Sequence, residues 1–477
     1  MAADQRGPDQ SVTPTLGRAS PKQGSCLAVA TLLLGTQRCV KAPLEALVAE
    51  RSAGGVVVGA MAIRVPDDEV GQKGRGLVKP RVVIAHDYLS QRGGAERVVL
   101  SLLTAFPGAR VVSSVYAPDQ TYAEFQQFDV ETSFLNRVPA LRRDPRLALP
   151  LLAKAWDSLR VDDAHVVICS SSGWSHGVRA AGKKIVYCHN PARWLYQPEV
   201  FLSHAPRFSR LALSILRPTL VAWDRRKAAT ADRYIANSTV VKERIRAIYG
   251  LEADVIHPPA AVNISQEQQP LPDLRLGYVL TVSRSRGYKN VEVVCQALAR
   301  RPDLTLVVLG GLPSGIWPSN IVGLKDISDA QLRWLYANCS ALVAVAKEDF
   351  GLTVPEVCSF GRPVVAWRAG GYLDTVAEGI NGVFIDEPTP DHILDGLDRL
   401  LAIDLPRADV LAYARRFDEE TFISRIRDLV TGVLREDGPS AHPVDLGPGQ
   451  AAGPISLQPS SPAIRQRSSA NTPINSA

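Results

Sequence analysis

The sequence predicts an α/β protein made of two successive domains, each organised around a parallel sheet. Short apolar runs typical of buried strands alternate along the chain with segments of helical periodicity. Many of these runs are followed at once by Gly, Ser, Asn or charged residues, as in Leu342–Ala346 and the Glu348–Gly351 segment after it. The chain has 477 residues, more than one hydrophobic core usually serves, and this favours two domains over one.

The folded part is expected to cover residues 80–434. Both ends of the chain are rich in Gly, Pro, Ser and Gln, a composition that buries too little apolar surface to fold. We predict disorder at residues 435–477, and either disorder or an artefact of an upstream start codon at residues 1–79. Between them we expect a first domain at 80–262, a second domain at 275–415 and a closing helix at 416–434.

Composition argues against several classes of protein. The net charge of +6 is mild; it fits a protein that handles phosphates or contacts an anionic membrane, and it does not indicate nucleic acid. The seven cysteines form no CxxC pair and the eight histidines form no HExxH motif, which argues against a disulfide framework and a metal site. No apolar run reaches the roughly 18–20 residues of a spanning helix, so we expect a cytoplasmic protein with at most a peripheral contact on the inner face of the plasma membrane.

The first domain should alternate strands with helices. Helices are expected around Ala95–Phe106 and Phe208–Ala229, and a third should start at Thr239 as its N-cap. Residues 136–160 form a basic amphipathic segment, a pattern more typical of a solvated surface than of a membrane contact. The predicted strands are Arg81–Ala85, Arg110–Val115, His165–Cys169, Lys184–Cys188 and Arg233–Ala236.

The second domain repeats this alternation after a polar stretch at Asn263–Asp273. Asn381-Gly382 is predicted to be a tight turn. The predicted strands are Tyr278–Val282, Leu304–Leu309, Leu342–Ala346 and Pro363–Trp367. The predicted helices are Val291–Ala299, Ser328–Asn338, a segment from Thr353 that stops by Gly361, Tyr372–Ala377, Asp391–Leu401 and Glu419–Leu434.

Loops at the predicted carboxyl edge of the second sheet carry residues suited to an anion. Arg284 and Lys289 would supply positive charge, while Gly351 and the pair Gly370-Gly371 would let backbone N–H groups approach a ligand closely. Helix N-termini add free donors and a favourable dipole. Together these features indicate a diphosphate site.

Two carboxylates, Glu348 and Glu356, lie beside this site in the sequence. An ionised Glu accepts two hydrogen bonds from a vicinal diol, so the pair would suit sugar hydroxyls. Structural interpretations stay open: Glu356 can close a capping box with Thr353, Arg284 can be a solvated cation, and His189 can be structural. Spacing by itself therefore predicts a two-domain α/β protein with a phosphate ligand, and no more.

Several motifs in a fixed order resemble the retaining glycosyltransferases of family 4, which have the GT-B fold. The segment EDFGLTVPE is similar to that family's E-x7-E motif, and Gly361–Val364 and the Gly370-Gly371 turn follow it. Arg284 and Lys289 match its Arg-x4-Lys loop, and Asn381-Gly382 matches a turn. HDYLSQRGGAER and YCHNPARWLY resemble the mannosyltransferase-like branch. The resemblance covers the whole predicted folded part and implies two Rossmann-like domains whose parallel sheets face each other across a cleft.

The resemblance implies a role for each matching residue of the second domain. Glu356 would hold the ribose hydroxyls of a nucleotide sugar. Glu348 would contact hydroxyls of the donor sugar, with the backbone of Phe350, Gly351 and Leu352 beside it.

It also implies roles for charged residues and for the first domain. Arg284 and Lys289 would neutralise the diphosphate and the charge that builds on it as it leaves. Gly94, at the N-terminus of the first helix, would face the phosphates, and His189 would help to position the reacting sugar near the acceptor. No DxD motif occurs, which agrees with a reaction that needs no metal and no cofactor.

The implied enzyme is a retaining hexosyltransferase that moves a hexose, such as mannose, from a GDP- or UDP-linked donor to a lipid-linked or polysaccharide acceptor. Three positions depart from the family pattern: Pro355 directly precedes Glu356, Val357 follows it, and Asp374 stands where the family has Glu. These departures leave the donor preference open. The alternatives are a nucleotide-sugar epimerase or sugar phosphorylase of the same fold, or a non-catalytic nucleotide-sugar-binding protein.

Overall fold

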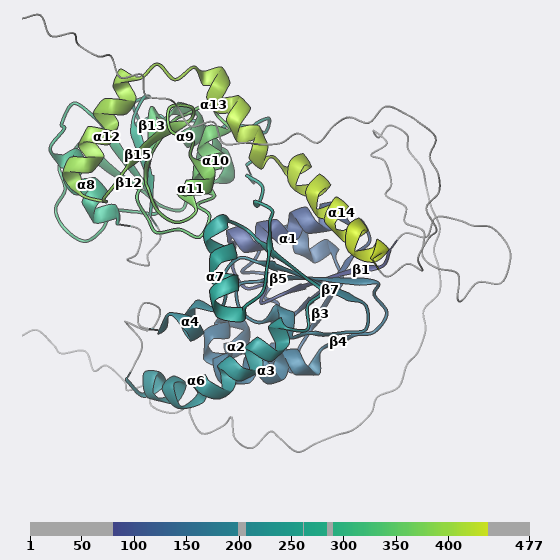
Figure 1. Cartoon of the computed structure of the whole chain (residues 1–477). Coiled ribbons are helices and arrows are strands. Elements are labelled where there is room, and N and C mark those ends of the chain that lie inside the picture. The colour runs from purple at the N-terminus through teal and green to yellow at the C-terminus, as the bar shows by residue number, and fades with distance from the viewer. Residues whose placement is uncertain (1–79, 199–206, 261, 284–289, 437–477) are drawn as a thin grey trace, which may run out of the picture. The chain divides into compact units, whose positions relative to one another are not determined.

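The computed structural model of the protein describes residues 80–198, 207–260, 262–283 and 290–436 (Figure 1). The predicted extension 1–79 and all but the first two residues of the predicted tail 435–477 lie outside this part of the chain. Within it, helices alternate with strands that form two parallel sheets, and the predicted α/β fold class with two Rossmann-like units is confirmed.

The first sheet is parallel throughout, with the strand order β3-β2-β1-β5-β7-β8-β9. Its central strands are buried along their whole length, because helices cover both faces. The strands are β1 (Val82–His86), β2 (Arg110–Ser113), β3 (Val130–Thr132), β5 (Val166–Ser171), β7 (Lys183–Cys188), β8 (Arg233–Ala236) and β9 (Asp254–Val255), with a small separate pair β4 (Arg160–Val161) and β6 (Arg179–Ala180).

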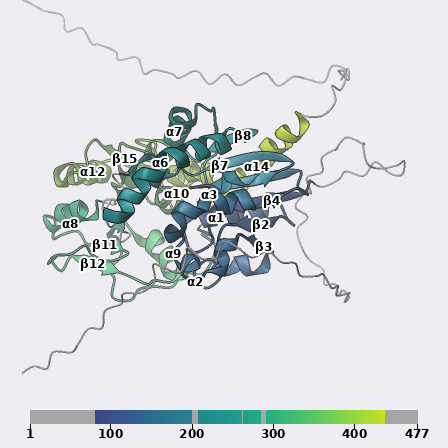
Figure 2. The same ribbon diagram turned by 90° about the horizontal axis from the view of Figure 1, so that it is seen from below.

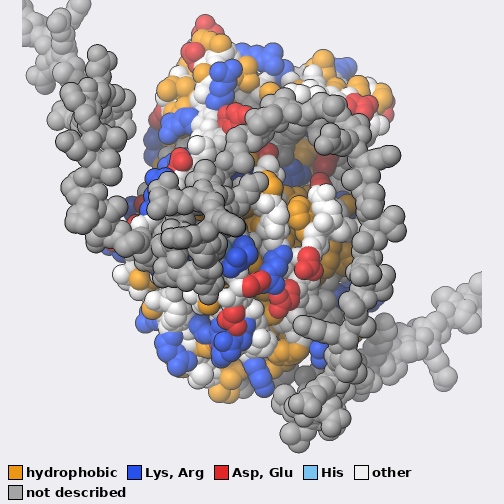
Figure 3. All heavy atoms as spheres, turned by 90° about the vertical axis from the view of Figure 1, so that its right-hand side faces the viewer, with side chains coloured by type: hydrophobic (Ala, Val, Ile, Leu, Met, Phe, Trp, Pro, Cys, Tyr) orange, Lys and Arg blue, Asp and Glu red, His pale blue; other side chains and the backbone are white. Residues whose placement is uncertain are grey.

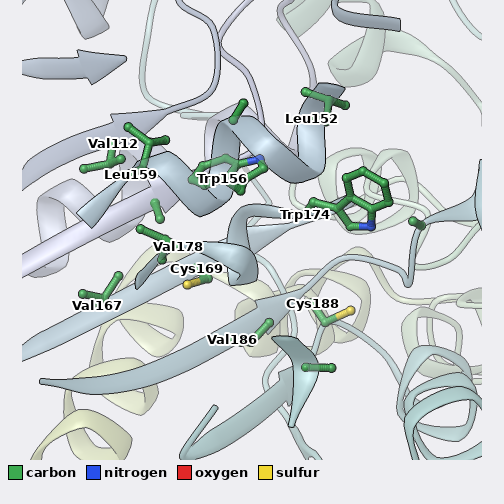
Figure 4. Close-up of a cluster of buried hydrophobic side chains, with 14 of the residues drawn as sticks. Val112, Leu152, Trp156, Leu159, Val167, Cys169, Trp174, Val178, Val186 and Cys188 are labelled. Carbon is green, nitrogen blue, oxygen red and sulfur yellow. The ribbon is translucent and has the colours of Figure 1, made fainter. Parts of the chain in front are cut away.

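The two faces of this sheet have separate apolar cores. On one face, α3 (Leu149–Ser158) and α6 (Arg207–Ala228) pack against each other (Figure 2), and Trp156 and Leu152 of α3 belong to the apolar cluster on this face (Figure 4). On the other face, α1 (Gly94–Ala105) packs beside α14 (Glu419–Arg435). The remaining helices of this part are α2 (Pro139–Arg143), α4 (Arg193–Tyr196) and α7 (Thr239–Tyr249), with short 3-10 turns at η1 (Ala123–Gln127), η2 (Phe134–Arg137), η3 (Pro145–Ala148) and η4 (Ser175–Gly177).

The second sheet is also parallel, with the strand order β12-β11-β10-β13-β14-β15. Its strands are β10 (Val279–Val282), β11 (Leu306–Leu309), β12 (Ile321–Leu324), β13 (Ala341–Ala344), β14 (Val364–Trp367) and β15 (Gly382–Ile385). Its helices are α8 (Val291–Ala299), α9 (Asp329–Asn338), α10 (Thr353–Cys358), α11 (Tyr372–Thr375), α12 (Pro390–Ala402) and α13 (Arg407–Ala414), followed by the turn η5 (Arg415–Phe417).

Several local predictions need correction. Thr239 does not cap α7: the N-cap is Ser238, whose hydroxyl accepts the Val241 N–H at 3.3 Å. The predicted turn at Asn381-Gly382 leads straight into β15, because Gly382 is that strand's first residue. The segment predicted as a helix over 372–377 is only the four residues of α11.

The basic segment 136–160 exposes Arg142, Arg143 and Lys154, as expected of a solvated amphipathic surface. Its second half is α3, whose apolar residues Leu152, Ala155 and Trp156 are buried in the core. Elsewhere on the surface, Lys and Arg lie among Asp and Glu, as on the face shown in Figure 3. No helix in the described ranges is both long enough and apolar enough to span a bilayer.

Candidate functional site

The turn between β13 and α10 carries Glu348 and is locked to the turn that follows β14. The N–H of Gly371 donates to the carbonyl of Glu348 at 3.0 Å. A Cβ added to Gly371 would lie 2.2 Å from Cα of Phe350, so only glycine allows this approach. Gly351 has φ of +81°, a conformation that side chains disfavour, and packs against the Tyr372 ring. The backbone around Glu348 is therefore fixed from two sides.

Glu356 is not part of a capping box. Helix α10 begins at Thr353 with Leu352 in the N-cap position, and no side chain caps it. Thr353 already lies inside the helix, so its hydroxyl is not placed to cap the first turn. The carboxylate of Glu356 instead accepts a 3.0 Å hydrogen bond from the hydroxyl of Tyr336 on α9. This tyrosine orients Glu356 from a neighbouring helix.

Phe350 has a structural side chain, although its backbone was the expected ligand contact. Its ring is 3% exposed and stacks on His257 with the ring centroids 5.4 Å apart. Phe417 closes the cluster, 5.8 Å from the Phe350 ring. The next residues, Gly351 and Leu352, then lead into α10. Because the ring is anchored, the backbone of this turn has little freedom to move.

Asp349, directly after Glu348, joins the turn to the first sheet's elements. Its carboxylate accepts hydrogen bonds from Arg193 at the start of α4 and from Arg244 on α7. Arg244 also donates to Oδ1 of Asn190 at 3.0 Å. Asn190 directly follows His189, so the loop after β7 and the loop after β13 share one guanidinium.

His189 lies at the end of β7 with its ring held by the protein. The backbone N–H of His189 donates to the carbonyl of Ser171 at 2.8 Å, and the ring Nε2 is 2.8 Å from the hydroxyl of Ser170. Tyr187 contacts the ring edge with centroids 5.2 Å apart. Burial, and then the nearby charge of His86, lower the pKa of His189 to about 3. The imidazole is therefore neutral at physiological pH.

Gly94 begins α1 and meets the second sheet's turn. A Cβ added to Gly94 would lie 2.5 Å from Cδ1 of Leu352, so two predicted site residues from distant parts of the chain are in contact. Arg97, one turn along α1, interacts electrostatically with Glu356. Burial lowers the pKa of Arg97, but Tyr122, Glu356 and Asp329 raise it on balance.

The two predicted phosphate cations, Arg284 and Lys289, lie outside the described residues. The described residues resume at Asn290, whose side-chain amide donates to the carbonyl of Val345 at 2.9 Å. This bond holds Asn290 beside the end of the strand that leads to Glu348. Among the described residues, no group of three or more His, Cys, Asp or Glu side chains is arranged to hold a metal ion.

Asp374, which stands where the family has Glu, accepts hydrogen bonds from the first residue of α7. Its carboxylate accepts the N–H of Thr239 at 2.9 Å and the hydroxyl of Thr239 at 2.5 Å. A carboxylate at a helix N-terminus is favourable, because it satisfies a free N–H donor there. The hydroxyl of Thr239, which was predicted to cap α7, thus donates to the carboxylate of Asp374 on α11.

Sequence reasoning missed the partners that orient these residues. Arg193 and Arg244 lie far from Asp349 in sequence, and Tyr336 is 20 residues from Glu356. No spacing rule pairs such residues, since they meet only after the sheets have formed. Arg193 stands within YCHNPARWLY, so that motif did mark the right loop.

Two family models match the chain in succession. The model "Glycosyltransferase Family 4" matches residues 92–262, and "Glycosyl transferases group 1" matches residues 264–417. The chain belongs to glycosyltransferase family 4. It is accordingly a glycosyltransferase enzyme with the GT-B fold, as its motifs implied.

Relatives of this family 4 glycosyltransferase differ in how much they share with it. Alpha-1,3/1,6-mannosyltransferase ALG2 of Homo sapiens is 24% identical over 431 residues, covering 77% of this chain and 99% of that protein. D-inositol 3-phosphate glycosyltransferase of Xylanimonas cellulosilytica is 30% identical over 219 residues, 39% of this chain. The match spans about half (52%) of that relative's length.

Solved structures share the fold at low identity. Anabaena HepE in complex with UDP has a TM-score of 0.54 and 16% identity, with 74% of this chain and 100% of that one covered. Sucrose-phosphate synthase from Thermosynechococcus elongatus has a TM-score of 0.56 and 15% identity, with 75% and 100% covered. At these identities the likeness concerns the fold of this family 4 glycosyltransferase.

Proposed function

We propose that this glycosyltransferase moves a hexose, such as mannose, from a nucleotide-diphosphate sugar to a lipid-linked or polysaccharide acceptor, with retention of configuration. The observation that supports it best is the turn between β13 and α10. It holds Glu348 on a backbone fixed by Gly371, and it leads to Glu356, which Tyr336 orients. Two carboxylates, one on a rigid turn and one in the helix that follows it, suit two sets of hydroxyls on one ligand.

Each residue has a distinct task in this proposal. Glu356 binds the ribose hydroxyls and Glu348 binds the donor sugar. Arg284 and Lys289 balance the diphosphate, which gains negative charge as its bond to the sugar breaks. Backbone N–H groups at the starts of α1 and α10, at Gly94 and at Leu352, add donors beside the phosphates.

The donor is either GDP- or UDP-linked. A relative is named as a mannosyltransferase, and a solved structure of similar fold contains UDP-glucose. A thermal-shift panel of GDP-, UDP- and ADP-sugars distinguishes them, because a ligand that binds the folded state raises Tm by mass action. A panel in which no sugar nucleotide raises Tm would count against the proposed donor class.

If the reaction is transfer, and not epimerisation or phosphorolysis, release of the nucleoside diphosphate should depend on the acceptor. The nucleoside diphosphate should be released only when donor and acceptor are both present. Formation of sugar 1-phosphate from a saccharide and inorganic phosphate, with no nucleotide donor, would indicate a phosphorylase, and isomerised donor without release would indicate an epimerase. The anomeric configuration of the product, read by NMR coupling constants, tests retention.

A lipid-linked acceptor would bring the enzyme to a membrane surface. Several apolar side chains of the first part of the chain are exposed, among them Val138 at 43% and Ile215 at 69%. Arg142 and Arg143 on α2 are exposed as well. We expect co-sedimentation with anionic vesicles at low salt, lost at high salt and weakened by Arg142→Gln/Arg143→Gln. No binding to anionic vesicles at low salt would remove this contact from the proposal.

A further inference from the structure

A line of polar side chains crosses the first sheet and ends at His189. His86 is the last residue of β1, and Ser170 lies opposite it on β5. Ring Nδ1 of His86 is 3.1 Å from the carbonyl oxygen and 3.1 Å from the hydroxyl of Ser170. The same hydroxyl is 2.8 Å from Nε2 of His189. The three side chains are thus linked through one serine oxygen.

The far end of the line is a buried carboxylate. Glu96, in the first turn of α1, is 1% exposed, and its Oε1 lies 3.6 Å from Nε2 of His86. Gln91 donates to the same oxygen at 3.0 Å. Oε2 of Glu96 has no hydrogen-bond partner among the described residues. A carboxylate this deeply buried is costly unless a positive charge faces it, and His86 is the group that can supply one.

The chemistry of the donors and acceptors sets the direction of each hydrogen bond. A carbonyl oxygen only accepts, so Nδ1 of His86 carries the hydrogen that points to Ser170. The Ser170 hydroxyl therefore cannot donate to His86, and His189 is its remaining acceptor among the described residues. Nε2 of His189 then has no hydrogen, which leaves the hydrogen of the neutral ring on Nδ1.

We propose that Glu96, His86 and Ser170 are positioning residues that hold His189 as the neutral tautomer with its hydrogen on Nδ1. This proposal rests on the proposed function, in which His189 meets the donor sugar. Among the described residues Nδ1 has no hydrogen-bond partner, so it is available to donate to a sugar hydroxyl. An incorrect tautomer would present a lone pair there instead and lose that contact.

The ionisation of the two histidines is consistent with this arrangement. Burial lowers the pKa of His86, but hydrogen bonding and attraction to Glu96, together with the charge of Asp87, raise it on balance. Burial and the charged His86 both lower the pKa of His189, to about 3. The two pKa values are thus shifted in opposite directions, so His86 takes up a proton more readily than His189, whose ring is neutral.

The tautomer is measured directly by NMR on the full chain labelled with ¹⁵N in the histidine rings. Two-bond ¹H–¹⁵N correlations separate the two neutral tautomers and the charged form, and loss of a signal set in His189→Gln assigns it among the eight histidines. We expect His189 to show the Nδ1–H tautomer, unchanged from about pH 5 to about pH 8. An Nε2–H tautomer, or titration within that range, would overturn the proposal.

Neighbouring serines provide a matched pair of variants. Ser170→Ala removes the hydroxyl that faces His189, so its ring should move toward the Nε2–H tautomer. Ser171→Ala removes an equally buried hydroxyl 3.2 Å from Nδ1 of His176 and should leave the His189 signals unchanged. Identical His189 spectra in wild type and Ser170→Ala would also overturn the proposal. Should Ser170→Ala not fold, the wild-type tautomer still decides it.

Kinetics test what the tautomer does for transfer. Ser170→Ala should lower kcat about tenfold to hundredfold, the size found for partners that orient metal-binding histidines, with KM for the donor little changed. Ser170→Thr keeps the hydroxyl and should restore most of the rate, which a purely structural role would not require. If no sugar nucleotide supports transfer by the wild type, the proposed function fails, whereas the NMR result still decides the tautomer.

Discussion

The hydroxyl of Tyr336 donates a 3.0 Å hydrogen bond to the carboxylate of Glu356. Tyr336 is 3% exposed, and burial together with the charge of Glu356 raises the pKa of its hydroxyl well above the ordinary value. The hydroxyl therefore stays protonated and remains a donor. Because it fills one acceptor position of Glu356, it orients the rest of the carboxylate for a ligand.

Tyr336→Phe should weaken binding of the nucleotide. Loss of one hydrogen bond to a charged group is worth about 1.5–3 kcal/mol, and we expect at least a severalfold rise in Kd by calorimetry. Tyr278→Phe is the matched control, since Tyr278 is also buried and its hydroxyl donates to the carbonyl of Leu335 at 2.8 Å. That variant should lose stability and keep its nucleotide affinity. Equal affinity loss in both would argue against a specific role for Tyr336.

Asp349→Asn should destabilise the protein, because the charge that pairs Arg193 and Arg244 is removed. The carboxylate is 16% exposed, so we expect a loss of about 1–3 kcal/mol in the free energy of unfolding, measured in urea. Asp303→Asn is the comparison: its pair with Arg301 lies at the surface, where such pairs contribute little. If the two variants lost the same stability, the bridge at Asp349 would be only a surface contact.

Gly371→Ala should reduce donor binding more than it reduces stability, because it disturbs the turn between β13 and α10 that carries Glu348. The new Cβ would lie 2.2 Å from Cα of Phe350, so the turn that carries Glu348 must shift. We expect a loss of donor affinity of about tenfold or more, equivalent to about 1.4 kcal/mol. Gly432→Ala, where nothing lies within 4 Å of the added atom, should keep full affinity and gain some helix stability. If Gly371→Ala bound the donor as tightly as the wild type, the close packing of Gly371 on Phe350 would not be what positions Glu348.

Acid should destabilise the wild type more than His189→Gln. The pKa of His189 is about 3 in the folded protein and near 6.5 when unfolded, so the unfolded state binds more protons between these values. Its contribution to stability is complete above about pH 6.5 and is lost as pH falls toward about 3. The raised pKa of His86 has the opposite sign but is present in both proteins. Urea midpoints that fall in parallel for the two proteins would contradict the lowered pKa.

The sheets could be predicted from the sequence because apolar runs mark buried strands, as at Val166–Ser171 and Val364–Trp367. Strands β3, β4, β6, β9, β12 and β15 were missed; each has at most four residues, and β12 and β15 also contain a glycine, at Gly323 and Gly382, so composition did not mark them. The exact residue at which a helix begins depends on backbone geometry, which residue types alone do not determine. Ser238 and Thr239 are equally good caps by residue type, and only the structure distinguishes them.

In the candidate site too, some residues could be predicted from the sequence and others could not. Motifs marked Glu348, Glu356 and His189, because chemistry demands those residue types. They could not mark Tyr336, nor the link from Glu96 through Ser170, since such partners come from separate strands and helices. The capping interpretation of Glu356 was wrong for a related reason: Leu352, with no side-chain cap, begins the helix one residue earlier than a capping box requires.

Helix α14 has a consequence for how the chain is made. Glu419 at its start accepts a 2.6 Å hydrogen bond from Ser101 on α1, 318 residues earlier, and its residues Phe422, Ile426 and Val430 complete the core on that face of the first sheet. The last strand of the first sheet, β9, ends at Val255, 164 residues before Glu419 (419 − 255), and a ribosome adding 5–20 residues per second needs roughly 8–33 s to make them. Throughout that interval the nascent first domain presents an uncovered apolar face, which is where chaperones would bind it.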